Sequence, residues 1–295
     1  MEESTKLVID KVAVIGTKKK AQQIAETVSS ASIEVVLLGE NEEQTERALK
    51  GISDSIDREI QRWGMTESDK RAILARIHTT TNVKDLGDCK VFIEAVGTTL
   101  EEKRKTLQQL EEYSIEPELY IIHINILSVT EIAANSKLAP KVIGMHFLEP
   151  VPKIPVVELI RGMHTDDWTV AVAMDFARRI GKTSVEVFEY PGYITNRVIL
   201  PMINEAIYVL MEGISSAEEI DIAIKLGFNL PMGPLAMADT IGLDEVLRRM
   251  ESLFHELGDL KYRPCPLLRK MVRAGRLGRS AGEGFFKYEK KEEDY

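Results

Sequence analysis

His146 and Glu158 are the residues whose types and spacing first suggest chemistry in this chain. His146 closes a short apolar run, and Glu158 lies in a second apolar run after a proline-rich turn. If both runs are strands, the two side chains can meet across a sheet, and a carboxylate that holds one imidazole nitrogen leaves the other free to accept a proton near neutral pH. The pair is therefore a candidate catalytic base. The alternative is a satisfied structural pair.

The chain before this pair alternates between strand and helix patterns. Strands are predicted at 10–16, 33–38, 89–96 and 119–125, and helices at 17–30, 100–113 and 129–136. After the pair, a helix at 165–180 and a strand at 183–188 continue the rhythm. Unbroken apolar strands joined by helices favour a parallel sheet covered on both faces. We predict one doubly wound, Rossmann-type α/β domain over residues 1–189.

A long polar segment at 43–77 interrupts this rhythm. Its periodicity predicts a helical hairpin with Gly64 at the turn and a new helix start at Thr66. His78, just beyond, is expected on a surface helix. Such a hairpin is most simply a surface excursion from the sheet.

The rhythm changes after Tyr190, and residues 190–295 are predicted to be a smaller all-α domain. Its helices are expected at 194–212, 216–226, 233–239, 243–257 and 265–274. The helix at 194–212 is apolar on more than one face, which indicates central burial or a dimer contact.

Composition narrows the function classes. The chain has 295 residues, 44% hydrophobic and 29% charged, as in ordinary globular proteins. A net charge of −9 argues against a nucleic-acid partner. Cys89 and Cys265 lie far apart, so neither a disulfide framework nor a metal site is indicated. The apolar runs are too short to cross a membrane, and we expect a cytoplasmic protein.

Four segments together resemble one family in order and spacing. They are IGMHFLEPVPKIPVVELI, YPGYITNRVILPMINEAI, LPMGPLAMADTIGLD and YRPCPLLRKMVRAGRLGRSAGEGFFKY. In this arrangement the chain resembles the L-3-hydroxyacyl-CoA dehydrogenase family, especially its short 3-hydroxybutyryl-CoA dehydrogenase members. The likeness covers nearly the whole chain. It implies NAD-dependent oxidation of a 3-hydroxyacyl-CoA to the 3-ketoacyl-CoA, or the reverse, and a homodimer through the helical domain.

The resemblance also implies roles for particular residues. His146 matches the general base, Glu158 the carboxylate that orients it, and Asn196 the substrate-side asparagine at the domain junction. Asn125 holds the position of the family's active-site serine. Ser55 and Arg62 match the residues that hold the CoA moiety, and Arg in place of Lys keeps the positive charge. Gly16, Lys18, Ala21, Glu40 and Lys103 fall at cofactor-binding positions.

This chain departs from the family pattern mainly on the cofactor side. The family loop is G-x-G-x-x-G, and here Lys18 replaces the middle glycine and Ala21 the third. A side chain at the middle position occupies space that the pyrophosphate would use. The ribose-binding aspartate position is held by Gly39, with Glu40 one residue later. Beside the chemistry, Glu149 is expected to raise the pKa of His146 or to compete with Glu158 for it.

Two functions from different classes follow. The first is a working dehydrogenase in which three lysines draw the pyrophosphate to a helix N-terminus. The second is a non-catalytic acyl-CoA-binding or subunit-partner homologue that has lost NAD binding. The retention of His146, Glu158 and Asn196 favours the dehydrogenase.

Overall fold

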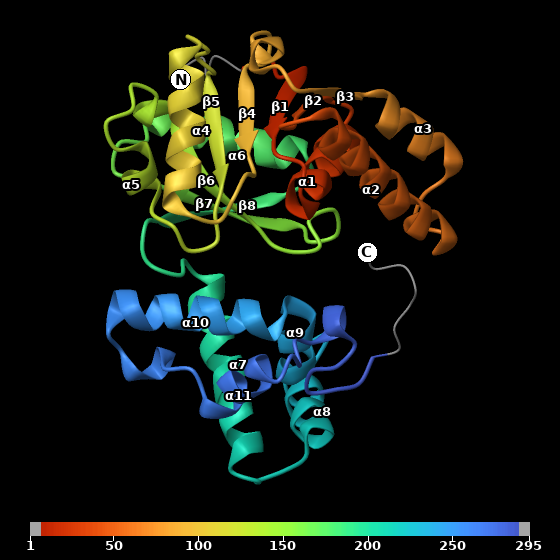
Figure 1. Cartoon of the computed structure of the whole chain (residues 1–295), viewed down its shortest axis with the longest axis vertical. Coiled ribbons are helices and arrows are strands. Elements are labelled where there is room, and N and C mark those ends of the chain that lie inside the picture. Colours follow the sequence, from red (N-terminus) through yellow and green to blue (C-terminus); the bar gives the residue numbers. More distant parts are fainter. Residues whose placement is uncertain (1–6, 289–295) are drawn as a thin grey trace. The chain divides into compact units, whose positions relative to one another are not determined.

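The computed structural model describes residues 7–288, and the chain divides into two compact units, Met1–Tyr190 and Pro191–Tyr295. The first unit is built around an eight-stranded sheet with the strand order β3-β2-β1-β4-β5-β6-β7-β8 (Figure 1). The strands are β1 (Lys11–Ile15), β2 (Glu34–Leu38), β3 (Ile77–Thr80), β4 (Val91–Glu94), β5 (Leu119–His123), β6 (Val142–Phe147), β7 (Val156–Arg161) and β8 (Thr183–Phe188). The order reverses between β1 and β4, which is the topological switch point where ligands bind in doubly wound sheets. The expected fold class is confirmed.

The described residues of this unit, from residue 7 onward, form six helices. They are α1 (Lys19–Ser30), α2 (Glu42–Gln61), α3 (Glu67–Ala75), α4 (Leu100–Glu112), α5 (Val129–Ala133) and α6 (Asp167–Arg179), with short 3-10 turns at Val83–Leu86 and Ala139–Lys141. One hydrophobic core joins α1, α2 and α6 to alternate residues of the strands, such as Val12, Val14 and Ile121. Since side chains alternate across a sheet, the intervening residues face the other side, where α4 and α5 contact each other (Figure 1).

Two details differ from the sequence expectations. The segment at 77–80 is a strand that pairs with β2, so the prediction of a helix through His78 is wrong. A four-residue strand with exposed polar side chains lacks the apolar run that marks the other strands. The second difference is that β7 runs antiparallel to β6, whereas the other neighbouring strands are parallel.

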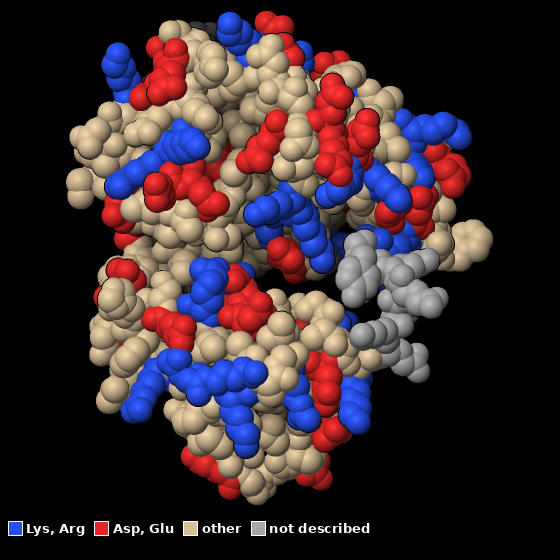
Figure 2. All heavy atoms as spheres, viewed as in Figure 1, with Lys and Arg blue, Asp and Glu red and all other residues tan. Residues whose placement is uncertain are grey.

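The hairpin between β2 and β3 follows the expected helix signals. Asn41 caps α2, and Thr66 caps α3 in a reciprocal capping box with Asp69. Lys70 on α3 forms an ion pair of 2.6 Å with Asp57 on α2, which ties the two helices together. On the face drawn in Figure 2, acidic side chains lie among basic ones.

The second unit is helical. It contains α7 (Thr195–Met211), α8 (Ala217–Gly227), α9 (Pro234–Ile241), α10 (Leu243–Leu257) and α11 (Pro266–Arg273), with 3-10 turns η3 (Leu260–Tyr262) and η4 (Arg279–Ala281). Its core gathers apolar side chains from all five helices. Among the described residues, no helix is both long and apolar enough to span a membrane.

Two buried aspartates organise the helical unit. Asp221 accepts hydrogen bonds of 2.8 Å from the backbone N–H groups of Leu235 and Ala236, and so caps the first turn of α9. Asp239 accepts from the backbone of Phe285 and Phe286 and from the hydroxyl of Tyr288. Burial raises the pKa of Asp239, and the hydrogen bonds from these donors oppose that shift. The two carboxylates thereby attach a helix start and the C-terminal segment to the core.

Glu26 is a buried carboxyl group on the face of α1 that packs toward α2. Its exposed fraction is 1%, and burial raises its pKa, with the nearby Ser55 hydroxyl opposing the shift. Because the folded chain binds this proton more tightly than the unfolded chain, ionisation disfavours the folded state. Stability from this site is therefore lost as the pH rises from the unfolded pKa of about 4.3 toward the raised folded value.

We expect Glu26→Gln to stabilise the protein at pH 7 and to leave stability at pH 4 unchanged. A gain of about 1 kcal/mol would raise the melting temperature by about 2–4 °C in a domain of this size. Melting curves between pH 4 and 8 test this, with Glu46→Gln as the control because Glu46 is exposed on the neighbouring helix. An equal change for both variants at every pH would contradict the prediction.

Candidate functional site

The carboxyl edge of the sheet collects the polar residues that the sequence singled out. β1, β4, β5 and β6 end there, at Ile15, Glu94, His123 and Phe147. β7 runs back from this edge because it is antiparallel to β6, and it begins after the turn that contains the prolines. A side chain early in β7 therefore lies beside one late in β6.

His146 and Glu158 are directly opposite each other in the β6–β7 register. Opposed residues of an antiparallel pair share one face of the sheet. Nδ1 of His146 lies 2.6 Å from Oε2 of Glu158, and both side chains are only 2% exposed. The carboxylate thus fixes the ring orientation and favours the tautomer that carries its proton on Nδ1. In that tautomer Nε2 can accept a proton.

The β6–β7 loop, residues 148–155, is held by side chains from several elements. The ammonium of Lys182 is buried and donates to the backbone carbonyls of Val151 and Ile154. Burial lowers the pKa of Lys182. From α1, the Gln23 side chain accepts a hydrogen bond of 3.2 Å from the Val151 N–H. On the other side, Lys153 pairs with Glu59 of α2 at 2.6 Å. The loop is thereby fixed to both sheet and helices.

Glu149, three residues after His146, forms an ion pair with Lys20. The ammonium of Lys20 lies 2.7 Å from Oε1 of Glu149 and donates to the backbone carbonyl of Phe147 at 3.2 Å. The sequence suggested that Glu149 would raise the pKa of His146 or compete with Glu158 for it. In the structure Glu158 contacts the imidazole and Lys20 pairs with Glu149.

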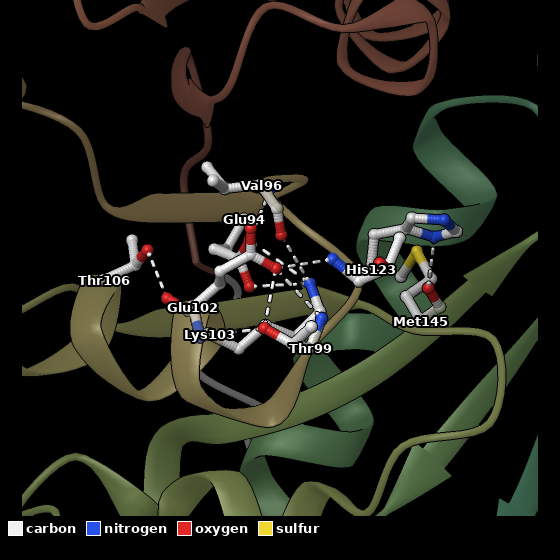
Figure 3. A network of polar contacts seen from close by, with 9 residues as sticks. Glu94, Val96, Thr99, Glu102, Lys103, Thr106, His123 and Met145 are labelled. Atoms are coloured by element: carbon white, nitrogen blue, oxygen red, sulfur yellow. Dashed lines mark hydrogen bonds and ion pairs between the residues drawn. The ribbon is translucent and has the colours of Figure 1, made fainter.

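A second histidine, His123, ends β5 beside this group. It is 9% exposed, and its Nδ1 lies 3.3 Å from the Met145 carbonyl oxygen (Figure 3). Its ring packs against Phe147. Burial lowers the pKa of His123 well below its usual value, and the positive charge of Lys20 acts in the same direction. These surroundings favour the neutral form of His123, whose ring lies near both Lys20 and His146.

Lys103 does not face solvent. It is 2% exposed, and its ammonium donates to both oxygens of Glu94, at 2.9 and 3.2 Å, and to the Val96 carbonyl at 3.1 Å (Figure 3). Burial raises the pKa of Glu94, and the charge of Lys103 opposes that shift. The pair joins β4 to α4 and fixes the start of the loop that follows β4.

The first loop retains features that suit a dinucleotide. Gly16 has a φ of +118°, and a Cβ there would approach the Ala95 carbonyl oxygen to 3.0 Å. Lys18 occupies the N-cap position of α1, in extended backbone conformation and without a side-chain capping bond. Lys18 is exposed, and its charge acts on Glu102 of α4. Ala21 is buried in the core beneath the loop.

At the end of β2, Gly39 holds the position of the family's ribose-binding aspartate, and there is no room there for a side chain. A Cβ on Gly39 would lie 2.5 Å from a methyl carbon of Thr45 and 2.8 Å from one of Thr17, so these threonines fill the space. Glu40 is exposed and accepts a hydrogen bond of 3.2 Å from Gln44. The carboxylate at this strand end is therefore displaced by one residue. With the tight turn at Gly16 and the helix N-terminus, these residues fit an NAD molecule.

The remaining predicted site residues are more dispersed. Asn125 follows β5 and is partly exposed. Ser55 is half-buried on α2 next to Glu26, and Arg62 ends that helix with a side chain that is 62% exposed. In the helical unit, Asn196 is buried in the first turn of α7 and accepts a hydrogen bond of 3.2 Å from Arg249.

Sequence reasoning missed several residues that the structure brings to this edge. Glu94 carried a signal, because an acidic residue within the apolar run CKVFIEAV requires a buried partner. Lys20, in a helix, and Lys182, in the turn between α6 and β8, carried no signal of these contacts, since lysine side chains are ordinarily solvated. Within the described residues there is no group of three His, Cys, Asp or Glu side chains that could hold a metal ion.

The fold and the site together define the class of Rossmann-type proteins with a dinucleotide-binding edge. Comparisons with known proteins make this specific. Residues 11–190 match the family model described as 3-hydroxyacyl-CoA dehydrogenase, NAD binding domain, and residues 192–288 match the C-terminal domain of the same family. The chain belongs to the 3-hydroxyacyl-CoA dehydrogenase family. This confirms the family and the cofactor implied by the resemblance.

Individual relatives agree with the family models. The chain is 41% identical to a probable 3-hydroxybutyryl-CoA dehydrogenase of Bacillus subtilis, over 96% of this chain and 99% of the relative. It is 40% identical to a 3-hydroxybutyryl-CoA dehydrogenase of Clostridioides difficile, over 95% and 100%. The crystal structure of (S)-3-hydroxybutyryl-CoA dehydrogenase from Ralstonia eutropha superposes with a TM-score of 0.88 at 40% identity, covering 96% of this chain and all of that one.

Lys103→Met is expected to reduce the free energy of unfolding by about 3–5 kcal/mol, because it leaves Glu94 buried without its cation. Urea denaturation would measure the loss. Adding Glu94→Gln should recover much of it, since the double variant has no buried charge at this pair. Lys105→Met is the matched control, because Lys105 is exposed on the same helix. A Lys103→Met protein as stable as the control would mean that the buried pair contributes little.

Proposed function

We propose that this chain is an NAD-dependent dehydrogenase that oxidises a 3-hydroxyacyl-CoA to the 3-ketoacyl-CoA, or catalyses the reverse reaction. The observation that carries the proposal is the buried contact of 2.6 Å between His146 and Glu158 at the carboxyl edge of a doubly wound sheet. The names of the full-length relatives point to a short substrate of the 3-hydroxybutyryl type.

The base acts through the nitrogen that Glu158 does not hold. Nε2 of His146 accepts the proton of the substrate hydroxyl group, and the Glu158 carboxylate stabilises the imidazolium that results. Bound NAD would supply the acceptor for the hydride that leaves the carbon bearing that hydroxyl group. Since His146 and Glu158 are already aligned and buried, substrate binding does not have to orient them.

Cofactor binding is assigned to the loop between β1 and α1 and to the end of β2. Gly16 permits the tight turn, the first turn of α1 presents backbone donors to the pyrophosphate, and Glu40 offers a carboxylate to the ribose hydroxyls. Lys18 is exposed at the N-terminus of α1 and can contribute positive charge there. For Lys103 we propose an indirect role, in which its pairing with Glu94 fixes the loop after β4.

The CoA moiety is assigned to α2. Arg62 carries an exposed guanidinium group that can bind phosphate in a bidentate manner, and Ser55 lies two turns earlier on the same helix. The substrate-facing roles of Asn125 and Asn196 stay predictions. The non-catalytic alternative rested on the changes gathered in the nucleotide site, at Lys18, Ala21 and Gly39. The family model of the NAD binding domain matches residues 11–190 with these changes in place, which supports the dehydrogenase.

A homodimer through the helical unit is a further part of this proposal. Four apolar residues on and beside α8, Ile214, Ile222, Leu226 and Phe228, are 56–72% exposed. Ile222 and Leu226 are four residues apart and therefore share one face of the helix. We refer to these four residues as the α8 patch. A cytoplasmic location is also proposed, supported by two free cysteines, Cys89 and Cys265, that are both buried.

His146→Gln is expected to lower kcat with acetoacetyl-CoA and NADH by about 10²–10⁴-fold, the contribution of a general acid or base. Binding of acetoacetyl-CoA, measured by titration calorimetry, should change little. His78→Gln is the control, because His78 is exposed on β3 and the substitution is the same. Loss of thioester binding together with turnover would show that His146 has a structural role instead.

Leu226→Glu is expected to weaken dimerisation at least tenfold, because it places a charge in the proposed contact. Sedimentation velocity should show a species of about twice 33.2 kDa for the parent protein and a concentration-dependent shift toward the monomer for the variant. Leu260→Glu, at a residue that is equally exposed but lies in η3 outside the α8 patch, provides the comparison. Identical behaviour of the two variants would rule out this surface.

A further inference from the structure

Lys20, in the first turn of α1, reaches the end of β6, the strand that carries His146. Its ammonium lies 2.7 Å from a carboxylate oxygen of Glu149 and 3.2 Å from the carbonyl oxygen of Phe147, the residue after His146. The side chain of Lys20 is 16% exposed, whereas that of Glu149 is 53% exposed. A mostly buried cation is thus paired with an anion that is half in solvent.

The Lys20 ammonium lies at the same end of β6 as the proposed base. It is bound to the backbone one residue beyond His146, and the charges of Lys20 and His146 both act on His123. In the proposed reaction the proton and the hydride leave atoms that are directly bonded to each other. The nicotinamide ring must therefore come close to the group that His146 deprotonates, and the Lys20–Glu149 pair adjoins that place.

We propose that Lys20 and Glu149 form a specificity-determining pair that sets the preference of the site between the oxidised and the reduced nicotinamide. This inference rests on the proposed function. The oxidised ring carries a positive charge and the reduced ring carries none. An uncompensated Lys20 ammonium would repel only the oxidised ring, and the Glu149 carboxylate removes most of that repulsion. The pair thereby keeps NAD⁺ binding possible with a lysine in this position.

The two charges are not equivalent in strength. Water and salt screen the half-exposed carboxylate of Glu149 more than the largely buried ammonium of Lys20. Loss of Glu149 should therefore have a larger effect than loss of Lys20. The other lysines near this edge are in different environments. Lys103 is buried and paired with Glu94, whereas Lys18 and Lys19 are exposed to solvent.

The test is calorimetric titration of the parent protein and its variants with NAD⁺ and, separately, with NADH. In Glu149→Gln the ratio of Kd for NAD⁺ to Kd for NADH should rise about 3–10-fold, through weaker NAD⁺ binding. In Lys20→Met the ratio should fall about twofold, and in the double variant it should return to within about twofold of the parent value. Lys19→Met is the matched control, and its ratio should not change.

The ratio of Kd for NAD⁺ to Kd for NADH distinguishes recognition of the ring's charge from a role of the Lys20–Glu149 pair in holding the loop. Loss of a contact that only holds the loop would weaken the binding of both nucleotides by the same factor. Equal weakening of NAD⁺ and NADH in Lys20→Met and Glu149→Gln would overturn the inference and leave the proposed function standing. A shift in Lys19→Met as large as that in Lys20→Met would overturn it as well. Failure of the parent protein to bind either nucleotide would refute the proposed function and this inference together.

Discussion

The antiparallel register of β6 and β7 is the constraint on which the site depends. It sets His146 opposite Glu158 on one face of the sheet. A slip of one residue would move one of the two side chains to the other face, because side chains alternate along a strand. The β6–β7 loop protects the register, since Lys182, Gln23 and the Lys153–Glu59 ion pair hold its backbone and side chains in one arrangement.

Much of the architecture could be predicted because its signals are local. Apolar strands, capping residues such as Thr66 and the helix periodicity after residue 190 each report on their immediate surroundings. The pairing of His146 with Glu158 was also accessible, because one turn joins their strands. The contact between Lys20 and Glu149 was not, since it spans 129 residues, and neither residue differs in type from an ordinary solvated charge. The short polar strand β3 was missed for want of an apolar pattern.

Charge compensation is a common property of the groups at the carboxyl edge. Glu94 is matched by Lys103 and Glu149 by Lys20, while Glu158 contacts the basic imidazole of His146. Each acidic residue is bound to a basic group from a different element, so these contacts join elements as well as balancing charge. Buried pairs of this kind contribute little net stability compared with apolar packing, but breaking one of them is strongly destabilising. Removing one residue of a buried pair at the carboxyl edge is therefore expected to destabilise the protein more than removing both.

The attachment of the β6–β7 loop has a consequence for the thermodynamics of ligand binding. Ordering the backbone of one residue opposes binding by about 1–2 kcal/mol of conformational entropy. Residues 148–155 are already fixed by Lys182, Gln23 and Lys20 before any ligand arrives. That entropy is lost during folding, so it does not reduce the affinity for cofactor or thioester. The protein therefore meets its ligands with this part of the site preorganised.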